Sequence, residues 1–210
     1  MRTLTTPAII LACFAAALCA QQSNRRGEPG KFDSYILALS WSPGYCDGRP
    51  EDPQCAPGRQ FSFVVHGLWP QYANGRWPES CSTDQGLPNA DRMLDIMPSR
   101  SLIRHEWNKH GTCSGLDAEG YFKLLRRTYE SVRIPQKFKQ LNQWILVAPA
   151  ELKREFIAAN PGMKESMLSV QCSRNVLSEV RICMGKDMKP EPCVSQPECR
   201  AEKMRVPPVR

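Results

Sequence analysis

The sequence lacks the patterns that mark several common kinds of functional site. None of its cysteines are two residues apart, as they are in zinc knuckles, and no serine or cysteine stands beside a histidine in a recognisable nucleophile motif. Internal repeats and Gly/Ser-rich linkers are also absent. These absences argue against zinc-finger modules and covalent catalysis, and they favour a single domain.

Long apolar runs are absent except at the start of the chain. Residues 7–20 are apolar and follow Arg2, which is typical of an export signal, and we expect cleavage near Ala20. Residues 21–210 would then form a soluble mature chain with no membrane segment. A lipoprotein processed at Cys13 or Cys19 is the alternative, but Cys13 comes early and Cys19 follows a large residue. Because no Asn-x-Ser/Thr acceptor is present either, we expect an exported protein, periplasmic or secreted, with a bacterial periplasm favoured.

The mature chain holds eight cysteines, which is an even number in an exported protein. This count predicts four disulfides and an oxidising compartment. The formal net charge of the whole chain is +7. A basic chain suits a polyanionic partner, although many exported proteins are equally basic and bind none.

The apolar patterning predicts an α+β fold, with one central, mainly antiparallel sheet flanked by helices. Alternation predicts strands over residues 32–42, 61–68, 167–172 and 176–184. Helical spacing or helix punctuation predicts helices over residues 93–97, 103–111, 117–129, 135–145 and 149–160. The tail from about residue 186 is rich in proline, and we expect it to be pinned by disulfides and frayed beyond Cys199.

The chain has only three histidines, and two of them lie in one short ionisable segment. The residues of this segment that carry chemistry are His105, Glu106, Lys109 and His110. On a helix, at about 100° per residue, these four share one face. Ser99 or Ser101 is placed to cap the helix and Gly111 to end it.

The third histidine, His66, lies near the end of the predicted strand 61–68. Alternation places Phe63 and Val65 on one face of this strand and His66 and Leu68 on the other. Gly67 and Pro70 are expected to end the strand. Most charge-rich helix faces are only solvated. A strand histidine that faces a helix with two more is instead the arrangement of an acid–base pair.

A metal site is the first alternative, because three histidines and a glutamate could bind zinc. The spacing His-Glu-x-x-x-His is one residue longer than the zincin motif, and it places Lys109 between the two histidines. An ammonium beside a dication is unfavourable. We therefore expect no metal and no other cofactor.

The same residues suit cleavage of an RNA phosphodiester. One imidazole removes the proton of a ribose 2′-hydroxyl, which attacks phosphorus, and another protonates the departing 5′-oxygen. Cations and a carboxyl group stabilise the phosphorane. DNA lacks the 2′-hydroxyl, so the pattern predicts an RNA substrate and no cleavage of DNA.

Two segments carry a resemblance to a known family. His66-Gly67-Leu68-Trp69-Pro70 and His105-Glu106-Trp107-x-Lys109-His110-Gly111-Thr112-Cys113 resemble the active-site segments of the T2-type ribonucleases, and weaker similarity runs from residue 35 to residue 183. The resemblance implies an α+β fold, no metal, and 2′,3′-cyclic phosphate ends that open slowly to 3′-phosphates. It also assigns roles: His66 is the general acid, His110 the general base, and His105 binds phosphate, while Glu106 and Lys109 stabilise the transition state.

The resemblance extends to base binding and to disulfide pairing. It implies a base pocket lined by Trp69 and Trp77, although Trp77 could equally be packed in its loop, and two indoles would accept any base. Some relatives have an aspartate that favours adenine where this chain has Gln71, which leaves base preference open. The implied disulfides are Cys46–Cys55, Cys81–Cys113, Cys172–Cys199 and Cys183–Cys193.

The sequence therefore predicts an exported, monomeric, metal-independent endoribonuclease of broad base specificity that acts on single-stranded RNA. Two alternatives remain open. One is a metal-dependent phosphoesterase or nuclease that uses the same histidines. The other is a basic RNA-binding or signalling module without catalytic activity.

Overall fold

The structure is a computed structural model that describes residues 27–87 and 89–209. The expected export signal, with its cleavage near Ala20 and the lipoprotein alternative, lies outside these residues. The strands are β1 Ser34–Trp41, β2 Phe63–Gln71, β3 Ile145–Val147, β4 Leu168–Ser173, β5 Val176–Gly185 and β6 Met204–Val206. The α-helices are α1 Ser42–Tyr45, α2 Arg100–Lys109, α3 Ala118–Ser131, α4 Gln136–Lys139 and α5 Pro149–Ala159, and the 3-10 helices are η2 Pro53–Cys55, η3 Ala90–Met93, η4 Gly111–Cys113 and η5 Glu165–Met167.

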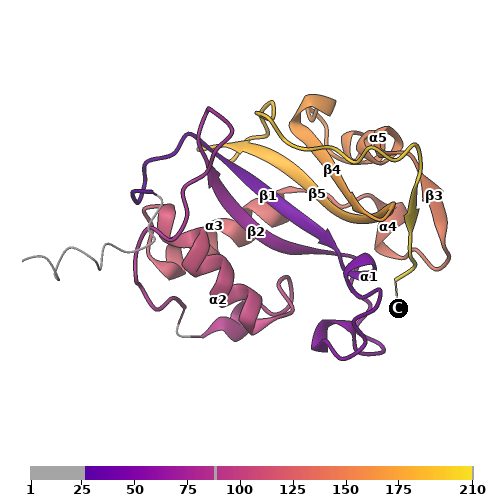
Figure 1. The fold of residues 1–210 in the computed structure, drawn as a ribbon, viewed down its shortest axis with the longest axis horizontal. Helices are drawn as coiled ribbons and strands as arrows, with labels where there is room; N and C mark the ends of the chain where they lie inside the picture. The colour runs from indigo at the N-terminus through magenta and orange to yellow at the C-terminus, as the bar shows by residue number, and fades with distance from the viewer. Residues whose placement is uncertain (1–26, 88, 210) are drawn as a thin grey trace, which may run out of the picture.

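The strands form one sheet in the order β2, β1, β5, β6 and β3, with β4 also paired to β5. All of the pairings are antiparallel except the short contact between β5 and β6. The sheet runs through the centre of the molecule, with α2 and α3 beside β1 and β2 and with α5 near β4 (Figure 1). The predicted α+β fold with a mainly antiparallel sheet is confirmed.

One hydrophobic core lies between the sheet and its helices. Alternate residues of β1 supply Leu37, Leu39 and Trp41, which are fully buried. The helices contribute their apolar stripes to the same cluster, including Trp107 of α2 and Phe156 of α5. Each such side chain contributes roughly 1.5–3 kcal/mol by leaving water. The opposite face of the sheet holds only a small apolar cluster, which leaves that face available for polar side chains.

The predicted alternation of strand 61–68 is wrong past Val65, because β2 contains a bulge. Leu39 pairs with Val65 and Ala38 with Gly67, so His66 has no partner on β1. The bulge shifts the alternation by one residue, which puts Leu68 in the core and turns Gly67 to the opposite face. The strand does not close at Gly67 but continues through Gln71.

Two predictions for the C-terminal half are also wrong. The expected helix 135–145 shrinks to α4, because Ile145–Val147 pairs with β6 as an edge strand, and Trp144 is exposed. The expected fraying beyond Cys199 does not occur, since Met204 and Val206 are fully buried in β6. Both segments are three-residue strands, which are too short for a clear period. The short helix expected at 93–97 lies earlier, as η3.

All four disulfides implied by the family resemblance are present. They are Cys46–Cys55, Cys81–Cys113, Cys172–Cys199 and Cys183–Cys193. The second joins the loop after β2 to η4, directly after α2. The last two fasten the C-terminal segment to β4 and β5. Four disulfides favour an oxidising compartment outside the cytoplasm.

Candidate active site

The predicted site residues meet in one cavity where α2 packs beside the edge strand β2. The cavity has a volume of about 340 Å³ and is lined by His66, Trp69, Gln71, Trp77, His105, Glu106, Lys109 and His110. All eight are residues predicted from the sequence. β5 and the C-terminal segment complete the wall with Arg181, Ser195, Gln196 and Pro197, among others.

Helix α2 presents its polar face to the cavity because a cap fixes its first residue and a buried indole fixes its apolar face. The hydroxyl of Ser99 accepts a hydrogen bond from the Leu102 amide, as predicted for an N-cap. Trp107 is buried, and its indole N–H donates to the carbonyl of Asp84 over 3.1 Å. The helix ends at Lys109, so His110 is its C-cap rather than an interior residue.

Gly111 serves a different purpose from the helix-ending role expected for it. It begins η4 with an ordinary negative φ rather than a left-handed one. A Cβ at this position would lie 2.4 Å from the Trp107 ring. Glycine is therefore required because the backbone approaches this indole closely.

Glu106 is a buried carboxyl group at the centre of the site. Its side chain is 1% exposed, and its Oε2 accepts a hydrogen bond of 2.6 Å from the Trp69 indole. Its Oε1 lies 3.6 Å from Nε2 of His66. Burial raises the pKa of Glu106 to about 7, against the opposing effects of His66, Trp69 and Lys109. Near neutral pH this group can therefore hold or release a proton.

Gly67 makes room for this carboxyl group. A Cβ on Gly67 would lie 2.1 Å from Oε2 of Glu106 and 2.3 Å from Nε1 of Trp69. The β2 bulge turns Gly67 toward α2, so the glycine and the bulge together admit the contact between Glu106 and Trp69.

His66 is held by carboxylates on two sides. Its Nδ1 lies 2.6 Å from Oε2 of Glu179 on β5, and its Nε2 faces Glu106. Burial lowers the pKa of His66, but the hydrogen bond and charge of Glu179 and the charge of Glu106 outweigh burial, so the pKa is raised. His66 therefore holds its proton to a higher pH than an ordinary imidazole.

His110 has the opposite environment. Its side chain is buried, and its Nδ1 has no hydrogen-bond partner among the described residues. Burial, followed by the charges of Lys109, His105 and His66, lowers the pKa of His110 to about 3. His110 is therefore neutral where His66 is protonated. The rings of the two histidines lie 5.3 Å and 5.1 Å from the same Trp69 indole.

His105 and Lys109 are cationic or potentially cationic groups at the mouth of the cavity. His105 is exposed and Lys109 is half-buried. Burial, followed by the charges of Lys109 and His66, lowers the pKa of His105. Both side chains are placed to meet an anion that enters the cavity.

The three residues proposed for base binding differ in exposure. Trp77 is 51% exposed and is among the residues that line the cavity, and its indole N–H donates to Oε2 of Glu79 in the same loop over 3.4 Å. Trp69 lies deeper, between the two histidines. Gln71 is buried, and its side-chain amide donates to the carbonyl of Pro70 over 2.9 Å, so its oxygen is the free end.

Glu179 and Arg181 were not predicted from the sequence as parts of the site. Both lie on β5 and alternate with Val180 and Ile182, which are buried in the core. This pattern looks like an ordinary solvated strand face. The feature that could have pointed to these residues is their place: two charged residues lie in the central strand of a sheet whose helices cover one face.

The described part of the chain offers no group of three or more His, Cys, Asp or Glu side chains arranged to hold a metal ion. Within the same residues, no helix has the length and apolar character to cross a bilayer.

Comparison with known proteins identifies the family. Residues 32–193 match the model of the Ribonuclease T2 family. The chain is 37% identical over 185 residues to a protein named "Ribonuclease" from Aeromonas hydrophila, covering 85% of this chain and 84% of that one. It is 27% identical to Ribonuclease I of Escherichia coli, covering 75% of this chain and 77% of that one.

Solved structures show the same fold. The crystal structure of RNase NT in complex with 5′-AMP superposes with a TM-score of 0.64 at 24% identity, covering 84% of this chain and 98% of that one. The S-like ribonuclease trichomaglin superposes with a TM-score of 0.69 at 20% identity, covering 86% of this chain and all of that one. From the family match and the relatives' similarity, the chain belongs to the Ribonuclease T2 family and is a T2-type endoribonuclease.

Proposed function

We propose that this protein cleaves single-stranded RNA without a metal, by transferring the phosphodiester to the neighbouring 2′-oxygen. The products are a 2′,3′-cyclic phosphate and a free 5′-hydroxyl, and the cyclic phosphate then opens slowly to a 3′-phosphate. The observation that supports this best is the opposite environments of His66 and His110 in one cavity. A reaction that needs one protonated and one neutral imidazole requires such a division.

In this proposal His110 is the general base and His66 the general acid. His110 is neutral because of burial and nearby cations, so it accepts the proton of the 2′-hydroxyl. The 2′-oxygen then attacks phosphorus and the bond to the 5′-oxygen breaks. Nε2 of His66 gives its proton to that departing oxygen, because Nδ1 is already occupied by Glu179.

Glu106, Lys109 and His105 stabilise the phosphorane. Lys109 and a protonated His105 lie at the mouth of the cavity and offset charge on the phosphoryl oxygens. Glu106 has a pKa of about 7 and donates a hydrogen bond when it is protonated. Groups of this type typically contribute about 10²–10³-fold each to turnover.

Base binding is proposed for Trp69, Trp77 and Gln71. The exposed Trp77 ring stacks on a base, as aromatic residues do in many single-strand sites. Stacking tolerates all four bases, and the side-chain oxygen of Gln71 leaves any preference among them open. Broad specificity follows.

The test uses matched oligoribonucleotides in excess EDTA. The control substrate carries a 2′-O-methyl group on the single nucleotide before the cleaved bond, and a DNA of the same sequence is included. We expect cleavage of the unmodified RNA at an unchanged rate in EDTA, no cleavage at the methylated position and no cleavage of DNA. Loss of activity in the chelator would support the metal-dependent alternative, and binding without cleavage would support an inactive RNA-binding module.

A further inference from the structure

We propose that Glu179 is a positioning residue for catalysis: it holds Nδ1 of His66 and thereby directs Nε2 toward the scissile bond. The inference deepens the proposed function and rests on the role of His66 as general acid. It assigns a catalytic purpose to a buried carboxylate that takes no direct part in the proposed proton transfers. Glu179 itself does not border the cavity described above.

The contact between Glu179 and His66 is short and protected. The atoms Oε2 and Nδ1 lie 2.6 Å apart, and the side chain of Glu179 is 9% exposed. Because His66 lies in the β2 bulge, no β1 residue pairs with its backbone. The contact with Glu179 therefore fixes the orientation of the His66 ring. When an imidazole donates one N–H to a carboxylate, the position of its second nitrogen is fixed as well.

Glu179 is fixed in turn by Arg181. The guanidinium Nε of Arg181 donates to Oε1 of Glu179 over 2.7 Å, so each carboxylate oxygen has its own partner. The Arg181 guanidinium also lies 5.1 Å from the centre of the Trp69 ring. The contact with Arg181 favours the ionised carboxylate and holds it in place beside His66, and the Trp69 ring helps to fix the guanidinium.

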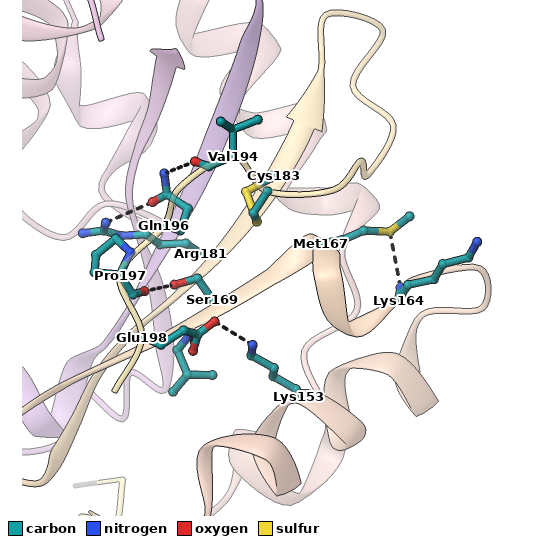
Figure 2. The surroundings of a disulfide bond; sticks show 12 residues. Lys153, Lys164, Met167, Ser169, Arg181, Cys183, Val194, Gln196, Pro197 and Glu198 are labelled. Carbon is teal, nitrogen blue, oxygen red and sulfur yellow. Dashed lines mark hydrogen bonds and ion pairs between the residues drawn. A yellow bond between two sulfur atoms is a disulfide. The ribbon is translucent and has the colours of Figure 1, made fainter. Parts of the chain in front are cut away.

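The far end of Arg181 rests on the C-terminal strap, which we define as residues 193–199. Nη1 of Arg181 donates to the side-chain oxygen of Gln196 over 3.2 Å. The disulfides at Cys193 and Cys199 fasten both ends of the strap to the sheet. Figure 2 shows Gln196 and Pro197 of the strap lying beside Arg181 and Ser169. A continuous chain of contacts therefore runs from the strap through Arg181 and Glu179 to His66.

The groups that face His66 determine how a change at Glu179 affects the protonation of this imidazole. Glu106 approaches from α2, Glu179 and Arg181 act from β5, and His105 and His110 line the same cavity. Removing the charge of Glu179 leaves only Glu106 to favour the imidazolium. We therefore expect His66 to lose its proton at lower pH and its ring to lose its fixed orientation.

The experiment compares wild type with Glu179→Gln, Glu179→Asp and the charge-matched control Glu165→Gln, a residue exposed on η5. Two readouts are taken: the pH profile of kcat and KM on a defined oligoribonucleotide, and the NMR titration of the histidine ring signals. The chain has only three histidines, and the His66 signal is identified by its loss in His66→Phe.

For Glu179→Gln we expect kcat to fall about 10–100-fold with KM little changed, as is typical when such a partner is lost. The alkaline limb of the profile and the titration of His66 should both move to lower pH. Glu179→Asp should restore part of both, and Glu165→Gln should match wild type. If Glu179→Gln does not fold, the double variant Glu179→Gln/Arg181→Gln, which leaves no unpaired charge, carries the same test.

An unchanged titration of His66 in a folded Glu179→Gln protein would overturn the inference, as would a fall in rate with no shift of the alkaline limb. A shifted titration with unchanged catalysis would have a different meaning. It would leave the contact supported and would contradict the role of His66 as general acid.

Discussion

The three histidines of the site differ mainly in what surrounds each ring. Carboxylates on two sides raise the pKa of His66, whereas burial and nearby cations lower the pKa of His110 to about 3. Only one arrangement of roles suits this difference. A base must be neutral before reaction and an acid must be protonated.

Replacement of either histidine should therefore remove activity without unfolding the protein. We expect His66→Phe and His110→Phe each to lower kcat by about 10²–10⁴-fold, the usual size of one acid or base contribution. Single-turnover cleavage measures this, with thermal unfolding and RNA binding as controls. Near-normal activity in His110→Phe would mean that the roles are misassigned.

The pH dependence of kcat/KM should be bell-shaped and wide. Activity falls at low pH as His110 becomes protonated, and its lowered pKa puts this limb below that of an ordinary imidazole. Activity falls at high pH as His66 and Glu106 lose their protons, and the raised pKa of each group puts this limb above that of an ordinary imidazole. Initial rates from strongly acidic pH, near the His110 pKa of about 3, to mildly alkaline pH check this prediction, and a rate that only rises with pH would contradict it.

Gly67 offers a test of the packing around Glu106. In Gly67→Ala the new Cβ would lie 2.1 Å from Oε2 of Glu106, so this carboxyl group must move away from Trp69. We expect at least about a tenfold loss of kcat. The control is Gly162→Ala, where φ is +91° and no neighbour lies within 4 Å. That change should cost about 1–2 kcal/mol of stability through backbone strain and leave kcat unchanged.

At the scale of elements, the meeting of α2 with β2 creates the site, and Cys81–Cys113 fixes this meeting. The disulfide closes a sequence separation of 32 residues, and the Ser80 amide also donates to the carbonyl of Lys109 over 2.8 Å. The end of α2 is thus tied to the loop that follows β2.

Removing this disulfide should affect both stability and catalysis. We expect the variant Cys81→Ser/Cys113→Ser to lose about 2–4 kcal/mol of unfolding free energy and also to lose kcat at temperatures where it remains folded. The matched control, Cys46→Ser/Cys55→Ser, opens a shorter loop that no site residue belongs to, and should retain kcat. Denaturant titrations together with activity assays separate the two effects. Equal losses of kcat in both variants would contradict the positional role of Cys81–Cys113.

The sequence predicted the regular elements and the ionisable face of α2 because both follow from local periodicity. Ser99 caps α2 as expected, since capping also depends on nearby residues. The β2 bulge, the short strands β3 and β6 and the contact from Glu179 to His66 could not be predicted. Each depends on pairing between segments far apart in sequence, which no local pattern contains.

At the scale of the whole molecule, the basic charge should assist substrate binding. With a net charge of +7, KM for RNA should rise with salt concentration, because bound phosphates release counterions, while kcat changes little. Steady-state assays at increasing salt measure this, and a KM independent of salt would mean that phosphate contacts contribute little to binding. The four disulfides indicate an exported protein, while the bacterial periplasm and the monomeric state remain predictions.

The most direct test of the central claim is mass spectrometry of the ends released from one defined oligoribonucleotide in EDTA. The proposed mechanism predicts a 2′,3′-cyclic phosphate on the upstream fragment and a 5′-hydroxyl on the downstream fragment, with 3′-phosphate appearing later. A 5′-phosphate paired with a 3′-hydroxyl would contradict it, because such ends require water rather than the ribose to attack phosphorus.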